Sequence, residues 1–251
     1  MQIDLNCDMG ESFGAYTIGA DQALMPLITS ANIACGFHAG DPVVLNQTVA
    51  LAKQSGVAVG AHPGFPDLIG FGRRTMQLSA DELENYVLYQ VAALAGFCQA
   101  HAVPLVHVKA HGALYNLAAN DAPTANAIAR GVVRFSKQLV FVGLASSRVM
   151  AEAAESLGLK FAREAFADRV YNPDGTLQSR KIAGALITDP AQAAKQAVEI
   201  AHGFVIAHDG TRVPIQAQTL CLHGDNPAAI NNAQAIRRAF ADANIPVKPL
   251  E

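Results

Sequence analysis

Short apolar runs alternate with longer helical patterns along this chain of 251 residues, and this alternation constrains the fold more than any other feature. Strands that are joined through helices pair in parallel, with right-handed crossovers. Seven such runs at this chain length favour a closed or nearly closed β/α barrel, similar to a TIM barrel, over a small doubly wound sheet. The runs are Ile3–Asp8, Ala31–Cys35, Val57–Ala61, Leu105–Lys109, Leu139–Val142, Lys160–Glu164 and Thr219–Leu222.

No linker or shift in composition marks a domain boundary, so we expect residues 1–251 to form one α/β barrel domain. An eighth strand is left open, because Ile182–Ile187 is apolar but short and interrupted by glycine. Phe204–Gln216 is expected to form a separate hairpin around Asp209-Gly210, a dipeptide typical of a type I′ turn.

Helix starts are marked by Asp or Asn followed by proline, which together supply a capping oxygen and a preset φ angle. Ser79 and Glu82 fit a capping box that opens a long helix towards Ala100. The proline-marked starts are Asp41-Pro42, Asp189-Pro190 and Asn226-Pro227, and the glycines expected at helix ends are Gly56, Gly158 and Gly203.

The composition indicates a large apolar core and no affinity for polyanions. Hydrophobic residues make up 51% of the chain and charged residues 16%, and the net charge is −3. We therefore expect neither a nucleic acid nor an anionic membrane as partner. No signal-peptide pattern or membrane-spanning run is visible. The four cysteines are too dispersed for a CxxC zinc site or a disulfide scaffold, so we expect a cytoplasmic enzyme.

Ionisable side chains recur at the ends of the predicted strands. In the fourth run, His107 and Lys109 alternate with Val106 and Val108, so the two polar residues face one side of the strand. Because the carboxyl ends of parallel strands meet at one mouth of a barrel, such residues are expected to gather there. The gathered set would be Asp8, His38, His62, Lys109, His111, Glu164 and His223.

Taken singly, these residues have a plainer explanation, because one histidine at a strand end is more often structural than functional. It is the joint pattern that predicts a functional cluster. His107, one step deeper than Lys109, is left open between the two interpretations. The histidines outside the strand ends are interpreted as structural: His101, His202 and His208.

A glycine-rich loop, residues 64–74, follows the third strand. Its Arg73 and Arg74 could hold a carboxylate or phosphate through paired hydrogen bonds, or form a solvated basic turn, and both alternatives stay open. The chain has no G-x-x-x-x-G-K-[ST] phosphate loop and no G-x-G-x-x-G motif after a strand. Nucleotide binding by those routes is therefore not expected.

Two chemistries suit the predicted barrel mouth. Carboxylates and neutral imidazoles could hold a divalent metal that polarises a carbonyl and activates water, with Asp8, His38 and His62 as candidate ligands. Alternatively, a carboxylate or histidine acts as general base on water while Lys109 or His111 stabilises the oxyanion. Both lead to hydrolysis of a C–N or ester-like bond, and no H-E-x-x-H motif supports the metal version.

Six blocks of the chain resemble the LamB/YcsF family, in order and over almost its whole length. They are LNCDMGES (5–12), NIACGFHAGD (32–41), GAHPGFPD (60–67), VKAHGALYN (108–116), EAFADR (164–169) and CLHGD (221–225). The resemblance implies a distorted seven-stranded β/α barrel of the glycoside hydrolase/deacetylase type. It also implies the A subunit of an ATP-dependent 5-oxoprolinase, which opens the lactam of 5-oxo-L-proline (pyroglutamate) to L-glutamate together with partner subunits B and C.

Under this resemblance the strand-end residues acquire roles. Since the chain has no recognisable phosphate loop, ATP would act through the complex with the partner subunits. Asp8 or Glu164 is the expected general base, and Lys109 and His111 are expected to stabilise the developing negative charge. The expected substrate contacts are Asn6, His38, His62, Arg73, Asp168, Arg169 and His223, with Arg73 or Arg169 facing the substrate carboxylate.

Two other functions stay open. The chain could be a stand-alone metal-dependent deacetylase or amidohydrolase, in which Asp8, His38 and His62 hold the metal. It could also be a non-catalytic subunit that binds oxoproline and delivers it to catalytic partners.

Overall fold

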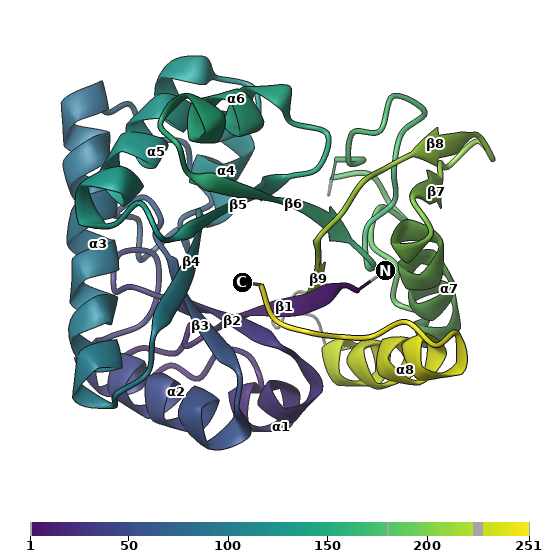
Figure 1. Cartoon of the computed structure of the whole chain (residues 1–251), viewed down its shortest axis with the longest axis horizontal. Helices are drawn as coiled ribbons and strands as arrows, with labels where there is room; N and C mark the ends of the chain where they lie inside the picture. Colours follow the sequence, from purple (N-terminus) through teal and green to yellow (C-terminus); the bar gives the residue numbers. More distant parts are fainter. Residues whose placement is uncertain (1, 180, 223–227, 251) are drawn as a thin grey trace.

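The computed structural model describes residues 2–179, 181–222 and 228–250, and a closed barrel of seven parallel strands lies at its centre (Figure 1). All seven predicted strands are confirmed, with ends that shift by at most two residues. Around the barrel the strands follow the order β1-β2-β3-β4-β5-β6-β9. They are β1 (Asp4–Met9), β2 (Ser30–Ala34), β3 (Ala58–His62), β4 (Leu105–Lys109), β5 (Val140–Leu144), β6 (Lys160–Phe166) and β9 (Thr219–Leu222).

The barrel closes through β9, which pairs in parallel with β6 on one side and β1 on the other. Thr219 is opposite Glu164 in one ladder and opposite Asp4 in the other. The segment Ile182–Ile187 contributes no strand to this ring. Its strand-like contacts among the described residues are an isolated bridge between Leu186 and Arg169, with the bonds from Ile187 N to Asp168 O and from Val170 N to Ala185 O.

Helices surround the barrel and pack against one another, as α3 does on α5 and α7 on α8 (Figure 1). The capping signals are confirmed where the structure describes them: Asp41 caps α2, and both halves of the Ser79–Glu82 capping box form at α3. Asn226-Pro227 lies outside the described residues. The helices are α1 (Asp21–Leu24), the 3₁₀ turn η1 (Met25–Leu27), α2 (Pro42–Ser55), α3 (Ala80–Ala100), α4 (Gly112–Ala118), α5 (Ala122–Phe135), α6 (Arg148–Ser156), α7 (Pro190–Ala201) and α8 (Ala229–Asp242).

The predicted hairpin is present as β7 (Phe204–Ile206) and β8 (Arg212–Pro214), which stands beside α7 and outside the barrel (Figure 1). The predicted type I′ turn is wrong. That turn needs positive φ at both central residues, but here Gly210 has φ +89° while Asp209 does not reach positive φ. Gly210 N instead donates to Ala207 O, so the turn precedes the glycine.

Polar side chains lie inside the barrel, below the carboxyl ends of the strands. His107 is fully buried there, with Nε2 2.8 Å from Oδ1 of Asn32. Its ring occupies the space that Gly60 leaves, since a Cβ on Gly60 would lie 2.0 Å from Nε2 of His107. These contacts favour the structural interpretation of His107. Asp4 lies deeper still and accepts hydrogen bonds from the hydroxyls of Ser30 and Thr219.

The C-terminal segment closes the opposite end of the barrel. Lys248 N donates to Ile3 O, and Leu250 packs against Val140 and Val142. Figure 1 shows the C-terminal segment running across the middle of the barrel. A site inside the barrel is therefore reached from the carboxyl ends of the strands.

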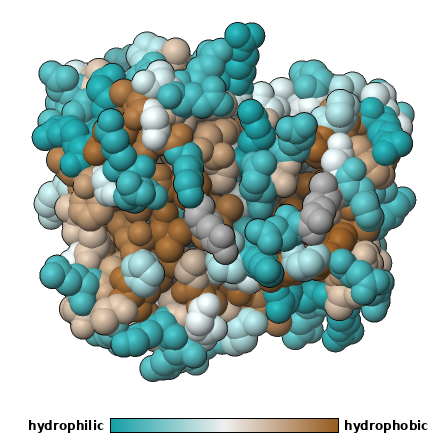
Figure 2. All heavy atoms as spheres, viewed as in Figure 1, coloured by the Kyte–Doolittle hydropathy of each residue, from teal (hydrophilic) through white to brown (hydrophobic). Residues whose placement is uncertain are grey.

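Hydrophilic side chains cover much of the face of the molecule that Figure 2 shows, with apolar residues between them. None of the helices in the described part of the chain is long and apolar enough to cross a membrane. The expectation that residues 1–251 form one domain stays a prediction.

Candidate active site

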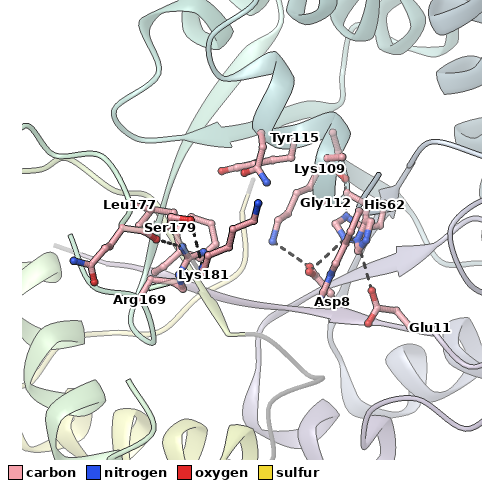
Figure 3. A pocket seen from close by; sticks show the side chains of 17 residues that line it. Asp8, Glu11, His62, Lys109, Gly112, Tyr115, Arg169, Leu177, Ser179 and Lys181 are labelled. Carbon is pink, nitrogen blue, oxygen red and sulfur yellow. Dashed lines mark hydrogen bonds and ion pairs between the residues drawn. The ribbon is translucent and has the colours of Figure 1, made fainter. Parts of the chain in front are cut away.

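A pocket of about 600 Å³ opens where the strands end (Figure 3). One wall comes from the ends of β1, β3 and β4, and the opposite wall comes from the long segment after β6. The polar side chains that line it are Asp8, Glu11, His62, Arg73, Lys109, His111, Tyr115, Asn116, Arg169, Gln178, Ser179 and Lys181.

Lys109 is the central cation of this pocket, and only 4% of its side chain is exposed. Its Nζ lies 3.0 Å from Oδ1 of Asp8, 3.0 Å from Sγ of Cys221 and 2.9 Å from Oε1 of Glu164. Burial by itself would lower the pKa of Lys109, but Asp8, Cys221 and Glu164 together raise it well above its usual range. Lys109 is therefore an ammonium ion with a fixed position.

Glu164 holds Lys109 from behind the pocket wall. It is completely buried, and its Oε1 also accepts from Nδ2 of Asn6 at 3.0 Å. Its Oε2 accepts from the hydroxyl of Tyr115 at 2.7 Å, and burial followed by Glu164 raises the pKa of Tyr115 well above its usual range. Both carboxylate oxygens of Glu164 are thus occupied by neighbouring side chains.

Asp8 has a different environment, since 13% of its side chain is exposed and it lines the pocket. Its Oδ1 accepts from Lys109 and from Nδ2 of Asn32 at 2.9 Å. Its Oδ2 lies 3.3 Å from Nε2 of His62 (Figure 3). Of the two predicted base candidates, Asp8 is the carboxylate that reaches the pocket.

Three histidines and one carboxylate meet beside Asp8. Glu11, His38, His62 and His111 each offer one ligand atom, and these four atoms lie within 4.8 Å of one another. His38 stacks on His111 with ring centroids 3.7 Å apart. Oε1 of Glu11 lies 3.7 Å from Nε2 of His38 and 3.7 Å from Nδ1 of His111. Imidazoles and a carboxylate are donors of the kind that a divalent metal takes, but the His38 and His111 rings are stacked at 4° to each other, so their in-plane lone pairs do not point at one position.

His38 gives a separate observation on metal binding. It is completely buried, and neither ring nitrogen has a hydrogen-bond partner among the described residues. Burial, then His111 and His62, lower its pKa well below the usual range, so the ring is neutral. A buried neutral imidazole without a partner has an unused lone pair, which is what a metal ligand requires.

The structure brings most of the predicted site residues together. Asp8, His62, Arg73, Lys109, His111 and Arg169 line the pocket. Asn6, His38, Glu164 and Asp168 are buried and do not belong to its lining, and His223 lies outside the described residues. Arg74 points elsewhere and pairs with Asp67. The four-residue cluster also differs from the predicted set of metal ligands, because it contains Glu11 and His111 and lacks Asp8.

Several site residues were missed from the sequence. Glu11 follows Gly10 immediately after β1, a position that strand-end reasoning could have included. Tyr115 lies one helical turn after His111, on the face of α4 that borders the pocket. Lys181 belongs to the segment after β6, and no pattern in the sequence indicated that this segment folds over the barrel mouth.

Two sequence spacings that are typical of other sites have structural roles here. Gly10-Glu11-Ser12-Phe13-Gly14 matches G-x-S-x-G, but Oγ of Ser12 accepts from Ile18 N and donates to Ile18 O. His107 and His111 match H-x-x-x-H, but His107 is bonded to Asn32 and does not belong to the four-residue cluster.

Fold and site together define a class: a seven-stranded β/α-barrel protein with a lysine, carboxylates and neutral imidazoles in a pocket at the strand ends. The family can also be stated. The model of the LamB/YcsF family matches residues 3–251, so the chain belongs to the LamB/YcsF family.

Individual relatives match over the full length. The chain is 54% identical over 249 residues to the A subunit of 5-oxoprolinase from Heliobacterium modesticaldum, covering 99% of this chain and 98% of the relative. It superposes on the lactam utilization protein from Thermus thermophilus with a TM-score of 0.95 and 48% identity, over 100% of both chains.

The fold extends to a more distant group. A family 4 carbohydrate esterase from Streptomyces lividans matches with a TM-score of 0.51 and 9% identity, over 98% of this chain and 91% of the esterase. That likeness concerns the fold alone, and it agrees with the predicted deacetylase-type barrel.

Proposed function

We propose that this chain is the subunit of an ATP-dependent 5-oxoprolinase that binds 5-oxo-L-proline and directs water onto its lactam carbonyl. The observation that carries the proposal is the pairing of Asp8 with Lys109 on the pocket wall. A carboxylate and an ammonium 3.0 Å apart can serve the attacking water and the carbonyl oxygen of one small amide. The full-length relatives, named as the A subunit of 5-oxoprolinase and as a lactam utilization protein, point to the same substrate.

The charge of the pocket suits this substrate, which carries a carboxylate next to its lactam ring. Four cationic side chains and two carboxylates are found among the described residues of its lining. Lys109 is already paired with Asp8, whereas Arg169 and Lys181 stand on the opposite wall (Figure 3). We place the lactam carbonyl at Lys109 and the substrate carboxylate towards Arg73, Arg169 or Lys181.

The reaction then follows from the positions of these residues. Asp8 takes a proton from water as the water oxygen bonds to the lactam carbon, and Lys109 stabilises the negative charge on the former carbonyl oxygen. The C–N bond breaks as the tetrahedral centre collapses, and the proton held by Asp8 passes to the departing nitrogen. Glu164 and Tyr115 do not touch the substrate in this scheme; they fix the position of Lys109.

ATP enters this proposal through partner subunits. A five-membered lactam is a resonance-stabilised amide, and the chain carries no phosphate-loop motif with which to activate it. We propose that subunits B and C couple ATP hydrolysis to this ring opening, while this chain binds the ring and directs water onto its carbonyl carbon. The relatives are named as one lettered subunit of 5-oxoprolinase, which fits such a division of labour.

A divalent cation bound by Glu11, His38, His62 and His111 would supply Lewis-acid polarisation next to Asp8. This cluster favours a second candidate function, a metal-dependent amidohydrolase that needs neither ATP nor partners. Hydrolysis of N-acetyl compounds by the isolated chain, abolished by a chelator, would establish that alternative in place of the first.

The test of the proposal is glutamate formation from 5-oxo-L-proline by the complex reconstituted with ATP. Asp8→Asn should lower kcat by roughly 10²- to 10⁴-fold, the usual contribution of a general base, with 5-oxoproline binding retained. Asp81→Asn, on the exposed start of α3, is the matched control and should keep full activity. Unchanged turnover in Asp8→Asn would assign this chain to substrate delivery and not to catalysis.

A further inference from the structure

We propose that Asn32 is a positioning residue for Asp8, and that His107 fixes the amide of Asn32 from two strands away. This role rests on the proposed function, because it concerns the carboxylate that takes the proton from water. Neither Asn32 nor His107 lines the pocket, so both would influence the reaction through Asp8 and not by touching the substrate.

The three side chains lie at one level around the barrel. Asp8 on β1 is opposite Asn32 on β2, and Asn32 is opposite Gly60 on β3. Gly60 in turn is opposite His107 on β4. Register partners in a parallel pair point their side chains to the same face of the sheet, so Asp8, Asn32 and His107 all face the barrel interior. Asn32 and His107 are completely buried there.

Gly60 lets His107 reach Asn32 across the strand between them. Because Gly60 has no side chain, the His107 ring lies over β3, with Nε2 2.8 Å from Oδ1 of Asn32. A Cβ on Gly60 would lie 2.0, 2.2 and 2.3 Å from three atoms of that ring. The strands β2 and β4 do not pair with each other, so this contact depends on the glycine between them.

The amide of Asn32 has one orientation. Its Nδ2 donates to Oδ1 of Asp8 at 2.9 Å and to Oδ1 of Asn6 at 2.7 Å, so both of its hydrogens are used. A reversed amide would place its oxygen against two oxygens that only accept. Asn6 is held in the same way, because its Nδ2 donates to Glu164 and its Oδ1 also accepts from Lys109 at 3.3 Å.

His107 binds the other end of this amide. Burial, then Lys109 and His62, lower the pKa of His107 to about 3, so the ring is neutral and has one proton on its nitrogens. The amide oxygen of Asn32 only accepts, so this proton is on Nε2, and His107 donates to Asn32. The donors therefore run in one direction, from His107 to Asn32 and from Asn32 to the carboxylate of Asp8.

These donors fix the carboxylate without adding a charge. Oδ1 of Asp8 accepts from Lys109 at 3.0 Å and from Asn32 at 2.9 Å, and the two bonds together set the rotation of the carboxylate group. Oδ2 then lies towards His62, 3.3 Å from its Nε2, at the pocket. Without Asn32 the group can rotate about its Cβ–Cγ bond, and a misplacement of about 1 Å costs roughly 100-fold in rate.

The test is glutamate formation from 5-oxo-L-proline by the complex reconstituted with ATP. Asn32→Leu keeps a branched side chain but removes both N–H groups. It should lower kcat roughly 10- to 100-fold, while KM for 5-oxoproline stays within about threefold of the unchanged chain. Asn232→Leu is the matched control, since Asn232 is a buried asparagine on α8 that does not line the pocket. It should keep kcat within about twofold.

A double variant separates positioning from a general loss of structure. If Asn32 acts only through Asp8, Asn32→Leu should cause no further fall in kcat once Asp8→Asn is present. Additive losses in the double variant Asp8→Asn/Asn32→Leu would overturn the inference. An unchanged kcat in Asn32→Leu, with a lowered kcat in Asp8→Asn, would overturn it as well and leave the proposed function standing. An unchanged kcat in Asp8→Asn is the separate result that would reject the proposed function.

His107 provides a second pair of variants, which decides the matter if Asn32→Leu does not fold. His107→Gln can place an N–H group near the position of Nε2 and should retain most of the kcat. His107→Leu removes the donor and should lower kcat roughly tenfold with KM unchanged. Circular dichroism should show that both variants are folded, and equal kcat values in the two folded variants would overturn the inference.

Discussion

Lys109→Met removes the cation around which the barrel mouth is arranged, and its cost can be worked out from the structure. Nζ forms ion pairs of 3.0 Å with Asp8 and 2.9 Å with Glu164, and both Lys109 and Glu164 are almost entirely buried. Removing one partner of a buried ion pair costs about 3–5 kcal/mol, because the other charge stays buried without compensation. Asp8 is partly exposed and adds less, so we expect a loss of about 3–5 kcal/mol in the free energy of unfolding.

A double variant tests the cause of that loss. Glu164→Gln removes the carboxylate that Lys109→Met leaves uncompensated, while a Gln side chain can still bond Asn6 and Tyr115. The double variant Lys109→Met/Glu164→Gln should therefore lose about 1–3 kcal/mol less in the free energy of unfolding than the two single variants lose together. Urea denaturation followed by circular dichroism measures all three variants.

Lys181→Met is the control for the loss of a lysine in the same pocket. Lys181 is exposed, so its replacement should change the stability by less than about 0.5 kcal/mol. A loss below about 1 kcal/mol in Lys109→Met, or strict additivity in the double variant, would refute the ion-pair reasoning.

Three further perturbations follow from individual contacts. Gly60→Ala places a Cβ 2.0 Å from Nε2 of His107 and should cost about 2–3 kcal/mol in thermal unfolding, since the buried ring has no room to move. Ser79→Ala removes the capping box with Glu82 at the start of α3 and should cost about 1 kcal/mol in urea. Burial raises the pKa of Asp4, so the folded state binds more protons than the unfolded state above about pH 4. The stability of the unchanged chain should therefore fall relative to Asp4→Asn as the pH rises from 4 to 8.

Each of these three predictions would be contradicted by a specific result. Wild-type stability of Gly60→Ala would mean that the His107 ring is mobile. No loss in Ser79→Ala would mean that solvent caps α3 equally well. A difference between Asp4→Asn and the unchanged chain that stays constant with pH would mean that Asp4 is ionised in the folded state as readily as in the unfolded one.

Strand positions were predictable because each strand contains a short apolar run, and several strands also carry polar residues of the opposite parity. His107 and Lys109 face the interior as the alternation with Val108 predicts, and their backbones pair with Val140 and Val142. Helix starts were predictable for a local reason, since a cap such as Asp41 acts on amides only two and three residues away.

Closure of the barrel was harder to predict. Ile182–Ile187 has the composition of a strand, yet β6 and β9 already complete the ring by pairing through Glu164 and Thr219. The apolar pattern of a six-residue segment does not show whether a free strand edge remains in the barrel for that segment to pair with. The turn of the β7–β8 hairpin was mistaken for a similar reason, because Asp209-Gly210 is compatible with more than one turn type.

The sequence indicated which residues lie together in the site, but not which role each of them has. Asp8 and Glu164 are both strand-end carboxylates, and only the fold shows that Glu164 is occupied by Tyr115 and Lys109 behind the pocket. Nε2 of His62 and Nδ1 of His111 lie 3.0 Å apart, and each ring also contacts a backbone carbonyl, which no motif encodes. Such tertiary contacts lie beyond what strand-end patterns can reveal.

The most direct test of the central claim is a crystal structure of this chain with 5-oxo-L-proline bound. The account predicts the lactam in the pocket of Figure 3, with its carbonyl oxygen within about 3.5 Å of Lys109. The carboxylate of the substrate should face Arg73, Arg169 or Lys181, and Asp8 should lie on the side from which water attacks. A lactam bound outside this pocket, or with its carbonyl turned away from both Lys109 and Asp8, would contradict it.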